Sequence, residues 1–369
     1  MKKIIVIMQE SICTTFSGIE VYSHNLFRNL DSQNFEIEVI AKNNKRVNEN
    51  IVKDNINYSL ISIQKNKFLT HLYFFYKSCK LINQKNPHII HGISFFPVGV
   101  LCIFYKFFFN RTTVIHAHAS DVYFINKFLM RYLGSFIINY LDLVISITDH
   151  LSEFLARRTN CRHDKIFRLP ISTNFHPSKK VKKVSSPLRI LWIGNFRPLK
   201  GTKTMIKCYN LVQAKLDARL TIVGGNKSEK SSKYMIECMQ FINNFKLEDN
   251  IKFTGSISSK QISNEYKNHD ILVISSYSEG FPSIILEAAV NSLPIVSTNV
   301  GGISEFLSSD CLVSPGDHIG LAKKIITISE SNYFRKNIIA QNYTKAQEEY
   351  SFEKTSNSLK SAYVEKLNA

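Results

Sequence analysis

The chain of 369 residues is long enough to form two or three domains of ordinary size. Its hydrophobic content of 44% is typical of a globular protein and excludes a disordered chain. The formal net charge is +18, so nucleic acid, anionic lipid and phosphorylated ligands are all admissible partners.

In the first half, apolar runs alternate with helical patterns. Strands are expected at residues 4–8, 37–41, 56–61, 88–91, 112–116, 143–147 and 166–169. Helices are expected at residues 18–30, 68–82, 122–140 and 149–157. This alternation predicts parallel strands joined by helical crossovers.

The cysteines and the first residues of the chain indicate the cellular compartment in which the protein is expected. Seven scattered cysteines show neither C-x-x-C nor zinc spacing, which predicts reduced thiols. The apolar run at 4–8 is too short for a signal peptide and is interpreted as the first strand. We therefore expect a cytoplasmic protein.

One apolar run, residues 88–109, is long enough to be considered as a membrane span. A spanning helix needs about 20 residues that are nearly all apolar, and this run contains two histidines, Pro97 and Lys106. A strand, a turn and a buried helix from Phe95 are the preferred interpretation. The aromatic and basic residues across 68–111 fit either core packing or a patch on an anionic membrane surface, and both stay open.

A polar, basic segment at 171–187 predicts a linker between domains 1–170 and 188–350. Beyond it the alternation restarts. Strands are expected at 188–193, 220–223, 251–254, 271–274, 294–297 and 311–313. Helices are expected at 202–214, 234–245, 258–268 (capped by Ser258), 283–290, 317–329, 332–348 and 351–367.

Glycines follow five successive strands of the second half. They lie at 194–201, 224–225, 255, 280 and 301–302. Glycine lets a backbone approach a ligand closely, and a helix N-terminus offers N–H groups to an anion. Residues 194–201 also supply Arg197 and Lys200, which suits a phosphate or diphosphate. The segment is neither a P-loop nor G-x-G-x-x-G.

Two glutamates flank the turn after the strand at 271–274. Glu279 is expected on the turn and Glu287 about two turns down the following helix. Ligands of open α/β sheets bind outside the carboxyl ends of the strands, so the two carboxylates are placed to hold sugar-like hydroxyl groups. Taken alone, however, two glutamates are more often solvated surface charges.

Residues 194–201, 279–287 and 294–305 resemble the signature segments of the retaining, nucleotide-sugar-dependent glycosyltransferases of family 4. The resemblance covers nearly the whole chain and is strongest over 188–306. It implies the α/β architecture called GT-B, with two Rossmann-like parallel-sheet domains facing each other across a cleft. The first domain would take the acceptor and the second the donor. The helix at 351–369 resembles one that crosses back to brace the first domain.

The resemblance implies a role for each matching residue of the second half. Glu287 would accept hydrogen bonds from the ribose, Glu279 would lie by the transferred sugar, and Lys200 would pair with the diphosphate. The family commonly has arginine where this chain has Asn195, and Arg197 is the candidate replacement. The whole donor-binding set would be Gly18, Gly194, Asn195, Arg197, Lys200, Glu279, Gly280, Phe281, Pro282, Ser283 and Glu287.

The first half carries two matching segments. Ser17-Gly18 resembles the Gly-Gly loop after the first strand, and residues 118–121 resemble a His-Gly-x-Asp segment. His118 would face the sugar, with His116 as the competing candidate. We expect Glu279, His118, Lys200 and Arg197 to carry the chemistry.

The resulting hypothesis is a hexosyltransferase that moves a hexose from a nucleotide diphosphate sugar to a growing glycan, such as a lipid-linked polysaccharide at the inner membrane face. No D-x-D motif is present, so neither a metal nor another cofactor is expected. An epimerase or a pyridoxal-dependent phosphorylase on the same architecture stays open, as does a silent partner subunit, because Ser17, Ala119 and Asn195 depart from the family. A nucleic-acid binder is disfavoured, since no helix-turn-helix, RNA-binding or zinc pattern is found.

Overall fold

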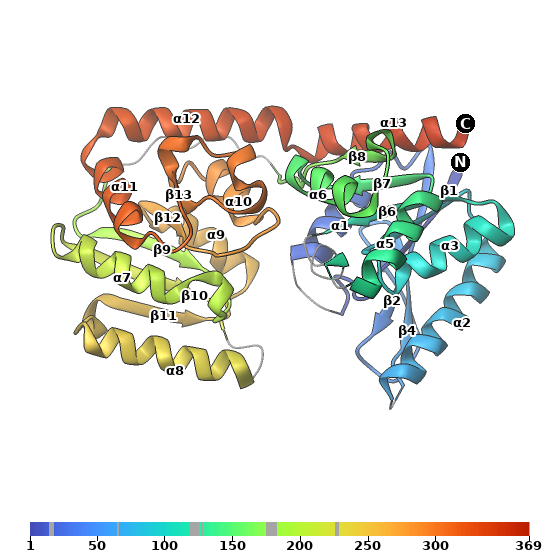
Figure 1. Ribbon diagram of the computed structural model, residues 1–369, viewed down its shortest axis with the longest axis horizontal. Helices are drawn as coiled ribbons and strands as arrows, with labels where there is room; N and C mark the ends of the chain where they lie inside the picture. The colour runs from blue at the N-terminus through green and yellow to red at the C-terminus, as the bar shows by residue number, and fades with distance from the viewer. Residues whose placement is uncertain are drawn as a thin grey trace. The chain divides into compact units, whose positions relative to one another are not determined.

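The computed structural model describes residues 1–14, 18–64, 66–118, 125–126, 128–174, 183–225 and 229–368. Contacts between residues divide the chain into two compact units. Unit 1 comprises Met1–Ser172 and Ser351–Ala369, and unit 2 comprises Thr173–Tyr350. Each unit is a sheet covered by helices (Figure 1). Within the expected linker, residues 175–182 lie outside the described ranges.

Unit 1 is built on an eight-stranded sheet in the order β3-β4-β2-β1-β5-β6-β7-β8. The strands are β1 (Lys2–Ile7), β2 (Phe35–Asn43), β3 (Glu49–Lys53), β4 (Ile56–Ser62), β5 (Ile89–Ile93), β6 (Thr112–Ala117), β7 (Leu143–Ser146) and β8 (Ile166–Arg168). In the central strand, residues 4–7 are all buried, as expected where helices cover both faces of a parallel sheet. Ile4 pairs with Ile37 on one side and Ile89 on the other.

Strand β3 pairs antiparallel with β4 and was not expected from the sequence. Its residues are mostly polar and none of them is buried, so no apolar run marks it. Asp54 and Asn55 form the two-residue turn to β4 with positive φ values of 49° and 64°. Such turns favour Asn, Asp and Gly, so this dipeptide is the local signal for the hairpin.

The helices of unit 1 are α1 (Gly18–Arg28), α2 (Lys67–Lys85), α3 (Val98–Phe109), α5 (Phe128–Tyr140), α6 (Asp149–Thr159), α13 (Phe352–Asn368) and the short η1 (His163–Lys165). The helix expected at 122–140 is seen from Phe128 onward, and 122–124 lie outside the described residues. Helix α13 contacts α1, and the Tyr363 hydroxyl lies 2.5 Å from His91 Nδ1. The last helix therefore packs on the first unit.

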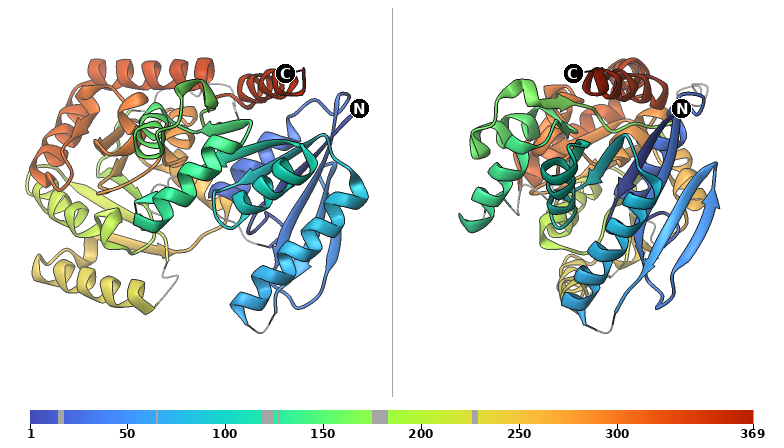
Figure 2. Two further views of the ribbon diagram at one scale, coloured as in Figure 1. Left: turned by 45° about the vertical axis from the view of Figure 1, so that its right-hand side comes forward. Right: turned by 90° about the vertical axis from the view of Figure 1, so that its right-hand side faces the viewer.

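Helices α2 and α3 lie side by side along the unit 1 sheet (Figure 2). The rings of Phe75 in α2 and Phe104 in α3 meet edge to face at 5.8 Å. Helix α3 buries Leu101, Cys102 and Tyr105, but Phe107, Phe108 and Phe109 are exposed, so it is not the fully buried helix expected from the sequence. Across the described ranges, no helix is both long and apolar enough to cross a membrane.

Unit 2 is built on a six-stranded sheet in the order β11-β10-β9-β12-β13-β14. All of its strands pair in parallel. The strands are β9 (Leu188–Ile193), β10 (Ala218–Val223), β11 (Ile251–Gly255), β12 (Ile271–Ile274), β13 (Ile295–Thr298) and β14 (Leu312–Val313). From β9 the chain adds β10 and β11 on one side and then β12 on the other. The strand order therefore reverses between β9 and β12, the kind of point at which open α/β sheets bind ligands.

The helices of unit 2 are α7 (Thr202–Gln213), α8 (Glu229–Asn244), α9 (Ser259–Asn268), α10 (Ile284–Val290), α11 (His318–Glu330) and α12 (Asn332–Glu349). Short 3₁₀ turns are η2 (Pro198–Lys200), η3 (Glu248–Asn250), η4 (Gly301–Glu305) and η5 (Ser309–Cys311). The capping box of Ser258 and Gln261 confirms the expected start of α9. Helix α8 begins five residues before the expected position 234.

Candidate functional site

Three loops meet at the carboxyl edge of the unit 2 sheet, where the strand order reverses. They follow β9 (residues 194–201), β12 (residues 275–283) and β13 (residues 299–302). The amide of Tyr277 donates to the carbonyl of Leu199 at 2.7 Å, and the amide of Gly302 donates to that of Gly280 at 2.8 Å. Backbone hydrogen bonds thus tie the middle loop to both neighbours.

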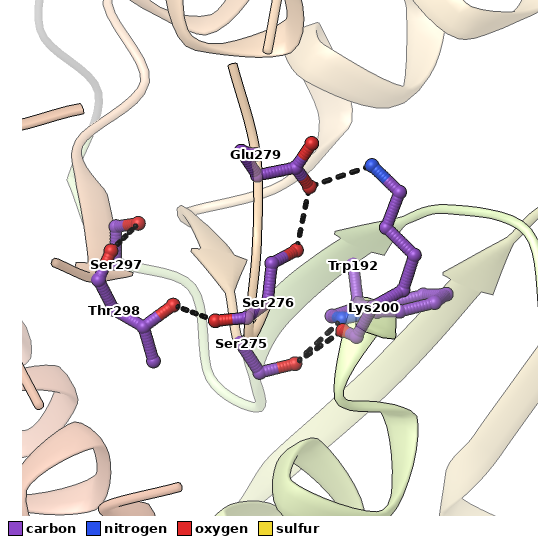
Figure 3. Close-up of polar contacts among 7 residues, drawn as sticks. All are labelled: Trp192, Lys200, Ser275, Ser276, Glu279, Ser297 and Thr298. Carbon is purple, nitrogen blue, oxygen red and sulfur yellow. Dashed lines mark hydrogen bonds and ion pairs between the residues drawn. The ribbon is translucent and has the colours of Figure 1, made fainter. Parts of the chain in front are cut away.

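The loops after β9 and β12 bring Lys200 and Glu279 together. Lys200 Nζ donates to Glu279 Oε1 at 2.6 Å, and Ser276 Oγ donates to the same oxygen at 2.6 Å (Figure 3). The side chain of Glu279 is 12% exposed and that of Lys200 31% exposed. A partly buried carboxylate is therefore held by one cation and one hydroxyl, with Glu279 and Lys200 separated by 79 positions in sequence.

A second layer of polar contacts fixes these loops. Trp192 Nε1 donates to Ser275 Oγ at 3.0 Å, and that hydroxyl donates to the carbonyl of Gly201 at 2.9 Å. Thr298 Oγ1 donates to the carbonyl of Ser276 at 2.6 Å. The sequence analysis did not select these residues as part of the site. Their signal is a pair of small hydroxyl residues directly after a buried strand.

Glycines let the loops pack against one another. A Cβ at Gly201 would lie 1.8 Å from the carbonyl oxygen of Ser275, and one at Gly224 would lie 1.8 Å from that of Gly194. Both glycines have positive φ, 66° and 142°. The close approach that the sequence predicted for a ligand is made here by neighbouring backbone.

Glu287 lies in the first turn of α10, so its expected place two turns down a helix was wrong. Residues 279–283 form a loop, and the helix begins only at Ile284. Tyr266 of α9 donates its hydroxyl to Glu287 Oε2 at 2.9 Å. Burial, and secondarily the Glu287 carboxylate, raise the pKa of Tyr266 well above its ordinary value. This phenol therefore stays protonated and holds the carboxylate in place.

The remaining predicted donor residues occupy the same loops. Arg197 is the exposed residue directly before η2, and its amide donates to the carbonyl of the half-buried Asn195 at 2.8 Å. The Phe281 ring is buried and stacks on Tyr350 with 5.5 Å between centroids. Pro282 and Ser283 are half-buried just before α10. The amide of Gly194 donates to the carbonyl of Val223 at 2.9 Å. These residues shape the loops, and their binding roles stay predictions.

In unit 1, His118 follows the carboxyl end of β6 and is buried. Its ring stacks on that of His116 with centroids 4.9 Å apart and planes 8° apart. The ring centroid of His116 in turn lies 5.8 Å from that of His91. Gly18 is the exposed first residue of α1, and a Cβ there would meet no atom within 4 Å. Ser17, Ala119, Ser120 and Asp121 lie outside the described residues.

The three neighbouring histidines, His91, His116 and His118, are neutral at physiological pH. Burial lowers the pKa of His91 to about 3 and that of His118 to about 4. Burial, with His118 and His91 nearby, holds the pKa of His116 well below its usual range. Among the residues described, neither ring nitrogen of His116 has a hydrogen-bond partner. His116 therefore acts as a packing group, which leaves His118 as the better candidate for contact with a ligand.

The free energy of unfolding is expected to fall as the pH is lowered from about 6.5 towards 5. In the unfolded chain each histidine takes up a proton near its ordinary pKa, whereas these rings stay neutral when folded, so the unfolded state binds more protons. Each ring then lowers the free energy of unfolding by about 1.4 kcal/mol per pH unit. Urea titrations at several pH values measure this slope.

His116→Phe is expected to reduce that slope by about one histidine's share, about 1.4 kcal/mol per pH unit. The control is His150→Gln, at an exposed position of α6, which should leave it unchanged. Equal slopes in wild type and His116→Phe would contradict neutral burial of this ring.

Acidic, histidine and cysteine side chains are the usual protein ligands of metal ions. Within the described ranges, no group of three or more is arranged to hold a metal ion. All seven cysteines are free thiols. The site groups that the structure brings together are thus a lysine, carboxylates and hydroxyls.

Two family models match the chain in succession. "Glycosyltransferase Family 4" matches residues 16–171, and "Glycosyl transferases group 1" matches residues 176–345. An uncharacterised glycosyltransferase of Methanocaldococcus jannaschii is 22% identical over 357 residues, which covers 94% of each chain. Several other curated relatives match along about half of their own length.

Solved structures share the fold along the whole chain. Sucrose-phosphate synthase from Thermosynechococcus elongatus superposes with a TM-score of 0.84 at 17% identity and 99% coverage of both chains. Anabaena HepE in complex with UDP gives 0.77 at 16% identity, covering 98% of this chain and 100% of that one. At these low sequence identities the structural matches establish the fold alone. Membership of the family rests on the two family models. The chain belongs to the family 4-like glycosyltransferases of GT-B architecture.

Proposed function

We propose that this protein transfers a hexose, with retention of anomeric configuration, from a nucleotide diphosphate sugar to a growing glycan, with a lipid-linked polysaccharide as acceptor. The observation that carries the proposal is the Lys200–Glu279 pair at the point where the unit 2 strand order reverses. It sets a cation suited to phosphate beside a carboxylate suited to sugar hydroxyls. HepE, which shares the fold, has been solved with UDP bound, and this supports a nucleotide sugar as donor.

The proposed chemistry follows the charges that develop during transfer. The carbon–oxygen bond to the diphosphate breaks, so negative charge grows on the leaving group while the sugar takes oxocarbenium character. Lys200 in η2, with Arg197 directly before that turn, would stabilise the leaving diphosphate. Glu279 would hold sugar hydroxyls and oppose the positive charge.

Neither glutamate is proposed as a nucleophile. The leaving phosphate would take the acceptor proton on the face from which it departs. The lysine and arginine supply the positive charge in this scheme, so the proposal needs no metal ion or other cofactor. Lys200 and Ser276 both donate hydrogen bonds to the Glu279 carboxylate. These bonds orient the carboxylate before a sugar binds.

Glu287 is assigned to the nucleotide ribose. It is half-buried, and the Tyr266 hydroxyl occupies its Oε2, so a diol would bind through the other oxygen. A hydrogen bond to a charged group contributes about 1.5–3 kcal/mol. Glu287→Gln is therefore expected to raise KM for the donor roughly tenfold to a hundredfold with little change in kcat. Initial rates at varied donor concentration test this, and Glu330→Gln at the exposed end of α11 is the control.

The proposal as a whole is tested by offering the purified protein a panel of nucleotide sugars with glycan acceptors. Release of nucleoside diphosphate identifies the donor, and the anomeric proton couplings of the product give the stereochemistry. An inverted product would overturn the retaining mechanism, and conversion of the free nucleotide sugar to an epimer would overturn transfer itself.

A further inference from the structure

Helix α2 presents apolar side chains to solvent. Phe68, Leu69, Leu72 and Tyr76 are all more than half exposed. Positions 68, 72 and 76 are four residues apart, so they form a stripe along one side of the helix. The opposite side carries Phe74, which is buried. The stripe is therefore additional to the apolar surface that packs in the core.

Helix α3 continues this exposed apolar surface at its carboxyl end. Phe107 and Phe108 are 67% and 65% exposed, and Phe109 is 48% exposed. Phe108 packs on the half-buried Phe104 at 5.0 Å, and Phe104 meets Phe75 of α2 at 5.8 Å. The exposed rings of α3 are thus joined to α2 through ring contacts.

Helix α5 adds a third stripe. Tyr132, Phe136 and Tyr140 recur every four residues and are exposed, with Phe136 and Tyr140 in contact at 4.5 Å. Helix α5 packs against α3, and Figure 1 shows α2, α3 and α5 beside one another in unit 1. We call the three stripes together the α2–α3–α5 face. A protein surface that needs no partner rarely gathers so many large apolar side chains on adjacent helices.

The charged residues of α2, α3 and α5 are all basic, and two of them, Lys85 and Lys106, are paired with Glu38 and Asp142 outside these helices. None of the three helices contains Asp or Glu. Across residues 55–141 the sequence has nine Lys or Arg and one acidic residue, Asp121, which gives a net +8. Lys80 and Arg131 are exposed on α2 and α5.

We propose that the α2–α3–α5 face binds the surface of a membrane that contains anionic lipid. Exposed aromatic rings suit the boundary between headgroups and acyl chains, and flanking cations suit the negative headgroups. A lipid-linked acceptor lies in a membrane, and a membrane-binding face would bring the enzyme to it. The inference therefore deepens the proposed function and rests on it. The basic charge favours an anionic surface over a second copy of this chain, because a symmetric dimer would bring one basic face against another, and like charges across an interface disfavour binding.

The test uses the full chain and sedimentation with vesicles. Binding is expected with phosphatidylcholine–phosphatidylglycerol vesicles, and much less with phosphatidylcholine alone. Raised salt should weaken it, because exposed charges are screened. Absence of binding to the anionic vesicles at low salt would overturn the proposal.

Paired variants locate the binding surface. Lys80→Gln with Arg131→Gln removes two exposed cations, each contributing about 1 kcal/mol to binding an anionic surface, so affinity should fall about thirtyfold. Lys323→Gln with Lys336→Gln, exposed in unit 2, is the matched control and should change affinity little. Equal losses in the two pairs would show attraction by net charge alone and would overturn the assignment to this face.

The apolar part of the face is tested in the same way. Phe107→Ser with Phe108→Ser should lower vesicle affinity at least tenfold. The control is Tyr333→Ser with Ile319→Ser, exposed in unit 2, and urea titration checks that each variant remains folded. If wild type forms a dimer that the Phe107/Phe108 variant abolishes, and vesicle binding is unaffected, the face is a self-association surface and the proposal fails.

Failure of this inference is distinguishable from failure of the proposed function. Transfer to a soluble glycan acceptor is measured without vesicles, and the face variants should retain it. If the wild-type protein transfers sugar but does not bind vesicles, only the membrane-binding proposal fails. If it binds vesicles but transfers sugar from no donor, the proposed transferase function fails.

Discussion

Lys200→Ala is expected to lower kcat/KM for the nucleotide sugar about a hundredfold to a thousandfold, the usual effect of removing one preorganised group that stabilises transition-state charge. The ammonium group lies on a strand-tip loop whose backbone is fixed by Tyr277 and Ser275. It is therefore placed before the donor binds. Rates of nucleoside diphosphate release, measured with the donor that the panel identifies, give the effect.

The difficulty with this variant is that Lys200 also neutralises Glu279, whose side chain is only 12% exposed. Without the lysine, that carboxylate keeps the Ser276 hydroxyl but loses its cation, at a cost of about 1–3 kcal/mol in the free energy of unfolding. The double variant Lys200→Ala with Glu279→Gln removes the unpaired charge. It should regain stability in urea titrations but no activity.

Two control variants test whether the effect of Lys200→Ala is specific to this position and to its positive charge. Lys207→Ala, exposed on the neighbouring helix α7, should leave both stability and kcat/KM near wild type. Lys200→Arg keeps the charge with a different shape and should retain part of the activity. Recovery of turnover in the Lys200→Ala/Glu279→Gln protein would show that Lys200 serves only to balance Glu279, and the assignment to the diphosphate would fail.

Much of the fold could be predicted because the strands are buried on both faces. Runs such as residues 4–7 and 271–274 are continuously apolar and buried, and this is the pattern that a covered parallel sheet produces. Strand β3 could not be found in this way, since it forms an exposed edge with polar side chains. The order of strands in each sheet depends on long-range pairing, which no local pattern contains.

The candidate site was predictable in its parts and less so in its arrangement. Lys200 and Glu279 were both selected from the sequence, but their 2.6 Å contact joins two loops that only the sheet brings together. Tyr266, which donates to Glu287, was also missed. A tyrosine in an amphipathic helix is ordinarily a packing residue, so nothing in the sequence pairs it with a glutamate on another helix. The start of helix α10 was predicted to within one residue, at Ser283 against the observed Ile284.

Gly301→Ala is expected to disrupt the site without touching any of its side chains. Gly301 has a φ of 58°, and a Cβ there would lie 2.0 Å from the carbonyl oxygen of Glu279 and 2.7 Å from that of Gly280. A backbone carbonyl cannot rotate away as a side chain does, so the loop that holds Glu279 must move. The left-handed conformation and the overpacking together should lower the free energy of unfolding by about 2–4 kcal/mol, and kcat/KM should fall with it.

Gly255→Ala separates the two causes. Gly255 has a similar φ of 68°, but a Cβ there would meet no atom within 4 Å, so this variant carries the conformational cost of about 1–2 kcal/mol alone. It should keep near-normal kcat/KM, because β11 lies at the far edge of the sheet from β13. Urea titrations and initial rates on both variants measure the difference. Equal loss of activity in the two proteins would mean that strained backbone, and not displacement of Glu279, lowers the rate. Loss confined to Gly301→Ala ties the rate to the position of a single carboxylate, since the loop it displaces carries Glu279 and the hydroxyl that orients it.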